Sequence, residues 1–133
     1  MKFTWKFSDQ FAKEFTSFPD DYRNSVVDFI TTYQDYGLSD FSKYEGKIAP
    51  SWSGNGSEED KKYAKENHLW HYHVGLPEYE QLHDSYKTSD YLLHFQWKFK
   101  GNDISIVDMY RHYKIDGSFY LPSEKYLDTE PSE

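Results

Sequence analysis

Three histidines lie within six positions of one short stretch of the sequence. Residues 66–79 read ENHLWHYHVGLPEY, in which His68, His71 and His73 stand among aromatic and apolar neighbours. Imidazole binds metal ions, and it also gains or loses a proton near neutral pH. Because side chains two apart on a strand point to the same face, we expect His71 and His73 to share one face and His68 to lie on the other with Trp70.

This histidine pair is open to more than one use. Together with His94 from a neighbouring strand, His71 and His73 would supply three ligands for zinc or another divalent ion. The H-x-H pair is a common one, and its short strand carries no Asp or Glu, so the sequence predicts no metal site and no cofactor. The alternative is that both histidines are half-buried strand residues held by hydrogen bonds.

A second polar group, Tyr110-Arg111-His112-Tyr113, follows an apolar run. Cleavage of RNA without a metal needs a base for the 2′-OH proton, an acid for the leaving 5′-oxygen and a cation for the phosphate charge. In this scheme His112 is the acid or base, Arg111 contacts the phosphate, and Tyr113 stacks on a base or donates its hydroxyl. The alternative is an exposed strand end made of common polar residue types.

These groups have to be positioned by strands and helices that the sequence also predicts. Phe3, Trp5 and Phe7 alternate with polar residues, which indicates a short first strand. Ser8 is a helix cap, and Pro19 and Gly37 bound a second helix. We therefore expect a helical hairpin after the first strand, over residues 9–17 and 19–37.

The rest of the chain predicts a polar loop, three strands and an end that frays. SWSGNGSEEDKK at 51–62 has the Gly and Ser content of a mobile surface loop. The lysines that follow Glu58-Glu59-Asp60, which are Lys61, Lys62 and Lys65, are predicted to lie on a solvated face. The expected strands are 68–74, 91–99 and 103–112, followed by a possible helix begun at Pro122 and an acidic tail over 128–133.

The last two strands are expected to meet in a tight hairpin. Gly101-Asn102 suits a two-residue type II′ turn, which pairs Phe99 with Ile104 and, further along, Phe95 with Asp108. This register predicts one apolar face and one polar, partly basic face that carries His94 and Lys98.

Composition limits the classes of protein to which the chain can belong. A length of 133 residues with 20% aromatics fits one compact domain, which we expect to cover residues 1–127. The chain has no Cys, and its beginning, MKFTWKFSDQ, has no apolar signal segment, so we expect a cytoplasmic protein with no membrane association. The net charge of −8 disfavours a general nucleic-acid binder, although all six histidines fall between His68 and His112 in a near-neutral segment.

Several blocks of the sequence resemble the RelE/ParE superfamily of bacterial toxins. A strand, a helical hairpin, a loop and three antiparallel strands that end in an aromatic, basic, His-Tyr run follow the order of elements in that superfamily. The blocks DFITTYQDYGLSDFSKYEGKIAPSW, NHLWHYHVGLPEY, YKTSDYLLHFQW and ISIVDMY look like those of its YafO-like branch, over about residues 4–127. The resemblance implies an α+β fold in which the first strand and the helical hairpin pack on a small, mainly antiparallel sheet.

The same resemblance implies a function and roles for residues. It implies an endoribonuclease that cuts mRNA on the ribosome without a metal, as the toxin of a type II toxin–antitoxin system, held inactive by a cognate antitoxin and reaching DNA only through the antitoxin complex. His112 takes the acid/base role with Tyr113 beside it, and His71 and His73 become second candidates for proton transfer on the sheet surface that meets the substrate. The family commonly has an arginine on the strand that here carries His94 and Lys98.

For contact with RNA, three side chains are candidates: His94, Lys98 and Lys65. A second interpretation belongs to a different class, a non-catalytic binding protein of the same fold. Such a protein would inhibit a protein target or act as an acidic neutralising partner, for which a net charge of −8 is natural.

Overall fold

The computed structural model describes residues 2–53, 57–76, 79, 89, 91–111 and 120–127. Five strands form one sheet in the order β1-β5-β4-β3-β2, in which β1 runs parallel to β5 and the other neighbours are antiparallel. The strands are β1 (Thr4–Phe7), β2 (Ile48–Pro50), β3 (Leu69–His73), β4 (Tyr91–Gln96) and β5 (Asp103–Arg111). The described helices are α1 (Asp9–Phe15), α2 (Asp20–Tyr36) and α3 (Glu58–Glu66), and the single 3₁₀ turns are η1 (Phe41–Lys43), η2 (Lys98–Lys100) and η3 (Glu124–Tyr126).

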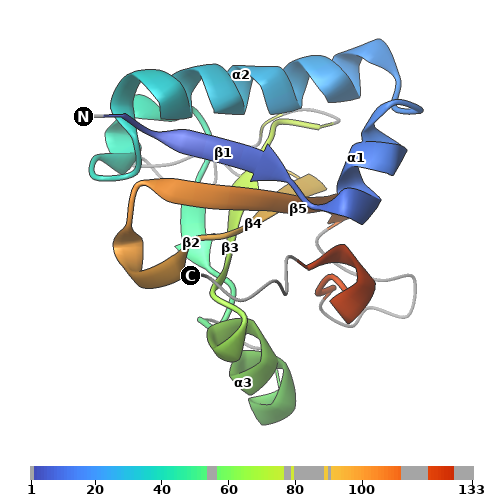
Figure 1. Ribbon diagram of the computed structural model, residues 1–133, viewed down its shortest axis with the longest axis vertical. Coiled ribbons are helices and arrows are strands. Elements are labelled where there is room, and N and C mark those ends of the chain that lie inside the picture. The colour runs from blue at the N-terminus through green and yellow to red at the C-terminus, as the bar shows by residue number, and fades with distance from the viewer. Residues whose placement is uncertain are drawn as a thin grey trace.

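The sheet has helical structure on both sides. In Figure 1, α2 crosses above the sheet, whereas α3 and η3 lie below it. The predicted α+β class with a mainly antiparallel sheet is therefore confirmed. No helix in the described part of the chain is long and apolar enough to cross a lipid bilayer.

The N-terminal third follows the predicted pattern closely. The Ser8 side chain accepts a hydrogen bond from the Phe11 backbone N–H at 3.4 Å and so caps α1. Pro19 precedes α2, and Gly37 ends it with a left-handed φ of 66°. One face of α2 is buried on the sheet, through Val26, Phe29, Ile30 and Tyr33.

The main core lies between α2 and the sheet. The Phe29 ring contacts the rings of Tyr72 and Phe95, with centroids 5.0 and 5.4 Å apart, and so joins α2 to β3 and β4. Phe95 and Ile106, which are cross-strand partners, are fully buried beneath it. Burial of these large apolar side chains fixes the first helical layer on the sheet.

A smaller core holds the opposite face of the sheet. Ala64 of α3 packs with Leu69, Val107 and Leu127, all of them buried. The face that the sequence predicted to be polar is therefore covered by α3 and by the chain around Leu127.

The prediction of a loop over residues 51–62 is wrong for its second half, because residues 58–62 form the start of α3. The Ser57 side chain caps this helix by accepting from the Asp60 backbone N–H at 3.1 Å. Acidic residues in the first turn add to the cap by interacting favourably with the helix dipole. This Ser-x-x-Asp signal was present in the sequence, but the neighbouring Gly and Ser residues outweighed it.

The predicted two-residue turn between the last two strands is also wrong. The connection contains η2, and Phe99 and Lys100 adopt left-handed φ values of 55° and 52°. The register differs as well, because Phe95 pairs with Ile106 and His94 pairs with Asp108.

The C-terminal segment contains less helix than the sequence predicted. The helix expected after Pro122 is the single turn η3, whose residues 124–126 are followed by an extended Leu127. The predicted acidic tail at 128–133 lies outside the described residues.

Candidate functional site

A row of ionisable side chains crosses three strands on the α3 side of the sheet. His71 of β3 pairs with His94 of β4, and His94 pairs with Asp108 of β5. The rings of His71 and His94 lie 5.8 Å apart between centroids, and those of His71 and His73 lie 5.7 Å apart. The sequence correctly predicted that His71 and His73 share a face and that His94 lies beside them.

A β-bulge places Asp108 in this row. Ile106 pairs with Phe95 and Asp108 pairs with His94, so Val107 is an extra residue on β5. In a bulge of this kind two successive side chains lie on the same side of the sheet. Val107 packs in the small core under α3, and Asp108 lies beside it on that face instead of on the predicted apolar one.

All three histidines of the row are buried, and His71 and His73 are held by hydrogen bonds. His71, His73 and His94 expose only 6%, 4% and 0% of their surface. The Nδ1 atom of His71 lies 2.9 Å from the Ser51 hydroxyl, and Nδ1 of His73 lies 2.9 Å from the Ser89 carbonyl oxygen. The expectation of an imidazole surface open to solvent is therefore wrong, because these side chains are almost fully buried in the folded chain.

Asp108 and Tyr120 form the polar end of the row. Asp108 is only 3% exposed, and it accepts a hydrogen bond from the Tyr120 hydroxyl. Burial raises the pKa of Asp108 to about 7, although the Tyr120 hydrogen bond acts in the opposite direction by stabilising the carboxylate. Burial also raises the pKa of Tyr120, with a further contribution from the Asp108 charge, so Tyr120 keeps its proton and remains a donor.

A pocket of about 620 Å³ opens onto this pair at the C-terminal end of β5. Its walls are largely aromatic. The rings of Tyr110 and Tyr120 lie 4.5 Å apart between centroids, and those of Tyr22 and Tyr91 lie 5.3 Å apart in an edge-on arrangement. A carboxyl group whose pKa lies near neutrality, in a concave aromatic site, is the arrangement expected of an acid/base residue.

The charges on the pocket wall are mixed. Glu14 accepts a hydrogen bond from the Tyr126 hydroxyl at 2.7 Å, and this carboxylate also raises the pKa of Asp108. Lys125 supplies a positive charge, and its Nζ atom lies 5.3 Å from the centre of the Tyr126 ring. The pocket can therefore exchange a proton through Asp108 and contact an anion through Lys125.

The residues of the predicted catalytic run are only partly described. Arg111 ends β5 and pairs with Tyr91 at the pocket, but its side chain is not among those described. His112 and Tyr113 lie outside the described residues. The backbone of β5 thus brings the Arg111 position next to a wall that contains Tyr110 and Tyr91.

The predicted RNA contacts lie apart from this pocket. Lys65 is exposed in the last turn of α3, and Lys98 is half-buried in η2, where its charge helps to lower the pKa of His68. Burial is the larger cause of that lowered pKa. His94 is enclosed in the sheet, so solvent reaches only the two lysines of the three predicted contacts.

No group of three or more His, Asp or Glu side chains in the described ranges is arranged to hold a metal ion. His71, His73 and His94 lie on one face, but they do not form such a group. Each of the rings of His71 and His73 instead has a hydrogen bond to a serine.

Sequence reasoning missed both Asp108 and Tyr120. A signal for Asp108 existed, because ISIVDMY places one carboxylate inside an otherwise apolar strand, and buried carboxylates are costly unless they are paired or neutral. The assumed register hid this signal by assigning Asp108 to the wrong face. Tyr120 lies 12 positions further on, in an irregular segment, so no local pattern connected the two residues.

No protein-family model, curated protein or solved structure matches this chain.

Proposed function

We propose that this protein is an endoribonuclease of the RelE-like type, which cuts mRNA on the ribosome as the toxin of a type II toxin–antitoxin system. The observation that carries the proposal is the Asp108–Tyr120 pair in the wall of an aromatic pocket, where Asp108 belongs to the strand that ends with Arg111. It supplies an acid/base group near neutral pKa and flat side chains on which bases can stack.

The proposed reaction uses the RNA strand's own 2′-hydroxyl. Its oxygen attacks the adjacent phosphorus and loses its proton to a base, while the bond from phosphorus to the 5′-oxygen breaks and that oxygen takes a proton from an acid. The products are a 2′,3′-cyclic phosphate and a 5′-hydroxyl. Asp108, at a pKa of about 7, is suited to the base role, and His112 to the acid role.

The other predicted residues then take supporting roles. Arg111 balances the charge on the phosphate, and Tyr113 stacks on a base or donates its hydroxyl. His71 and His73 are positioning residues in this scheme, because they are not among the residues that line the Asp108 pocket. Their hydrogen bonds to Ser51 and Ser89 hold β3 to its neighbours. No metal and no cofactor is required.

The order of the elements supports the same proposal. Along the chain, one strand and a helical hairpin come first, and the antiparallel strands β3, β4 and β5 come later. This is the order on which the resemblance to the RelE/ParE superfamily rests. The proposed partners are the ribosome with its mRNA and a cognate antitoxin, in the cytoplasm.

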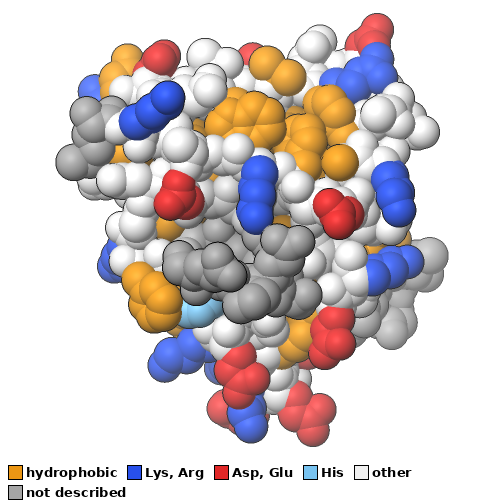
Figure 2. Space-filling view, viewed as in Figure 1, with side chains coloured by type: hydrophobic (Ala, Val, Ile, Leu, Met, Phe, Trp, Pro, Cys, Tyr) orange, Lys and Arg blue, Asp and Glu red, His pale blue; other side chains and the backbone are white. Residues whose placement is uncertain are grey.

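The acidic charge favours a second candidate function, that of a non-catalytic binding protein. The net charge is −8, and Figure 2 shows basic side chains interspersed with acidic ones on the face over β1 and β5. A surface of this kind suits a protein target better than free polyphosphate. In the nuclease proposal the RNA is instead presented by the ribosome, so the protein does not have to attract it from solution.

Induced expression separates the two functions. The nuclease should arrest growth, and primer extension on mRNA from the arrested cells should show new 5′ ends within translated frames. These ends should accept phosphate from polynucleotide kinase without prior phosphatase treatment, because they carry a 5′-hydroxyl. Growth arrest without new mRNA ends would support the binding protein instead. If induction causes no growth arrest and no new mRNA ends, both functions are contradicted.

A further inference from the structure

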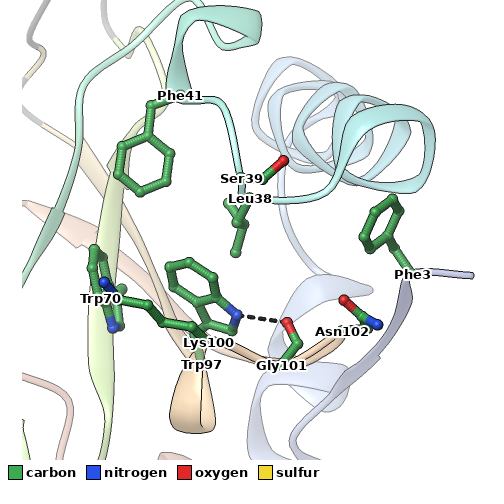
Figure 3. A pocket seen from close by; sticks show the side chains of 9 residues that line it. All are labelled: Phe3, Leu38, Ser39, Phe41, Trp70, Trp97, Lys100, Gly101 and Asn102. Atoms are coloured by element: carbon green, nitrogen blue, oxygen red, sulfur yellow. Dashed lines mark hydrogen bonds between the residues drawn. The ribbon is translucent and has the colours of Figure 1, made fainter. Parts of the chain in front are cut away.

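A second pocket, of about 480 Å³, lies at the opposite end of β5 from the Asp108 site. It opens between the segment that leads into η1 and the connection from β4 to β5 (Figure 3). Asn102 precedes the first residue of β5, whereas Asp108 is its sixth, so about 20 Å of strand separate the two sites. The proposed nuclease reaction makes no use of this pocket.

Four aromatic side chains line this second pocket, and three of them, Trp70, Trp97 and Phe41, lie close together on one wall. Trp70 and Trp97 are each 7% exposed, and their rings meet edge to face with centroids 4.9 Å apart. Phe41, which is 38% exposed, stands 6.1 Å from the Trp70 ring and 6.4 Å from the Trp97 ring. The Trp97 Nε1–H group donates to the Gly101 carbonyl at 2.8 Å, which fixes this indole before any ligand enters (Figure 3).

The rim of the pocket is polar and positively charged. Lys100 is the one charged residue among the nine that line it, and Asn102 and Ser39 add an amide and a hydroxyl. The neighbouring carboxylates are not among the nine lining residues, and each accepts hydrogen bonds outside the pocket, Asp40 from Ser42 and Asp103 from Thr4. The aromatic wall and Lys100 therefore favour a ligand that has both a flat ring and a negative charge, although the net charge of the whole chain is −8.

We propose that this pocket binds one nucleotide unit. The base lies against Trp97, Trp70 and Phe41, the Asn102 amide bonds to its edge, and Lys100 contacts the phosphate. The volume is within the range of small-ligand pockets, and Lys100 disfavours the cationic ligands that aromatic walls otherwise attract. This binding does not depend on the nuclease proposal, since it involves no residue of the Asp108 site.

The test is titration of the intact protein, with the indole N–H signals of its four tryptophans followed by NMR. The probes are adenosine 5′-monophosphate, adenosine, inorganic phosphate and a 2′-O-methyl oligoadenylate, which attack by a 2′-hydroxyl cannot cleave. We expect the nucleotide to shift the signals of Trp70 and Trp97 and to leave that of Trp5 unchanged. If the oligomer binds more tightly than the monophosphate, the nucleotide unit comes from an RNA strand. If the oligomer binds equally or more weakly, the ligand is a free nucleotide.

Two variants and a control assign the contacts. Lys100→Glu should weaken binding of the monophosphate about tenfold and change adenosine binding less than about twofold, because a charge-assisted contact is lost. Phe41→Ala should weaken binding of both, whereas Lys13→Glu, the same charge reversal on exposed α1, should change neither. The proposal is overturned if neither nucleotide probe shifts Trp70 and Trp97, if Lys100→Glu binds the monophosphate as tightly as the wild type, or if inorganic phosphate alone produces the same shifts. All of these outcomes can be read whether or not the protein cleaves mRNA.

Discussion

His94 of β4 and Asp108 of β5 are direct cross-strand partners. They pair because Val107, which precedes Asp108, is an extra residue that forms a bulge in β5. Without the extra residue, the alternation of β5 would assign Asp108 to the core under α2. With it, the carboxyl group lies on the α3 side, within hydrogen-bonding distance of Tyr120. One inserted residue thus places the carboxyl group of an otherwise apolar strand in the wall of the pocket.

The raised pKa of Asp108 predicts a pH-dependent stability. The folded protein holds a proton on this carboxyl up to about pH 7, whereas the unfolded chain releases it near 3.8. The folded state therefore binds more protons over this interval, and the contribution of Asp108 to the free energy of unfolding falls as pH rises from about 4 to about 7. Asp108→Asn removes this loss. The difference in free energy of unfolding between the variant and the wild type should therefore increase in favour of the variant as pH rises from about 4 to about 7, by an amount on the order of 4 kcal/mol.

Urea denaturation of wild type and Asp108→Asn at several pH values from 4.5 to 8 checks this prediction. Only the difference between the two proteins is interpreted, because other groups titrate in both. Asp35→Asn, at an exposed position on α2, controls for the loss of one negative charge. A difference between Asp108→Asn and wild type that stays constant across this range would show that Asp108 titrates normally.

The proposed base role predicts the pH dependence of cleavage. If Asp108 accepts the 2′-hydroxyl proton, single-turnover cleavage on stalled ribosomes should rise with pH and level off above about 7. Asp108→Asn should lower the rate about 100-fold or more. Tyr120→Phe removes a hydrogen bond that lowers the pKa of Asp108, so the rise should move to higher pH.

The shift caused by Tyr120→Phe distinguishes a chemical role from a structural one. Loss of packing alone would lower the rate equally at all pH values. Tyr36→Phe, which removes a hydroxyl from an exposed tyrosine of α2, is the matched control and should leave the profile unchanged. A Tyr120→Phe profile that keeps the wild-type midpoint would remove Asp108 from the base role.

The assignment of the acid to His112 predicts a loss of toxicity. Induction of His112→Ala should permit growth, because removal of a general acid typically slows the reaction 10²- to 10⁴-fold. His68→Asn is the matched histidine control, since His68 stands at the start of β3 with a φ of 56°, which Asn tolerates, and contacts the ring of Phe99. Equal arrest by wild type and a well-expressed His112→Ala would assign the acid to another group.

Two glycines predict opposite responses to the same substitution. A Cβ atom at Gly46 would lie 1.9 Å from the His73 carbonyl oxygen, so Gly46→Ala must displace the backbone at the edge of the sheet. We expect a loss of about 2–3 kcal/mol in the free energy of unfolding. A Cβ atom at Gly101 would meet nothing closer than 3.4 Å, and Gly101→Ala should change stability by less than about 0.5 kcal/mol.

Thermal unfolding of the two alanine variants checks this pair. Both substitutions add the same methyl group, so the difference between them isolates the close approach of Gly46 to β3. Similar unfolding temperatures for the two variants would mean that β2 moves away from β3 without cost.

The sequence predicted the first 37 residues well because their signals are local. Alternation of Phe3, Trp5 and Phe7 and the capping by Ser8 each act within a few positions. The shared face of His71 and His73 follows from the same local geometry, since it depends only on the two-residue period of a strand. Helix α3 was missed although its cap was visible, because its composition is that of a loop.

The sequence by itself determined the class of fold, the hairpin of helices and the grouping of histidines on one face, because these depend on spacing along the chain. Only the tertiary structure decided which side of the sheet Asp108 faces, because a bulge adds one residue without leaving a compositional mark. It also decided that Asp108, Tyr120 and Glu14, which are far apart in sequence, share one pocket. Burial in that pocket, which the sequence does not encode locally, is what raises the pKa of Asp108 towards neutrality.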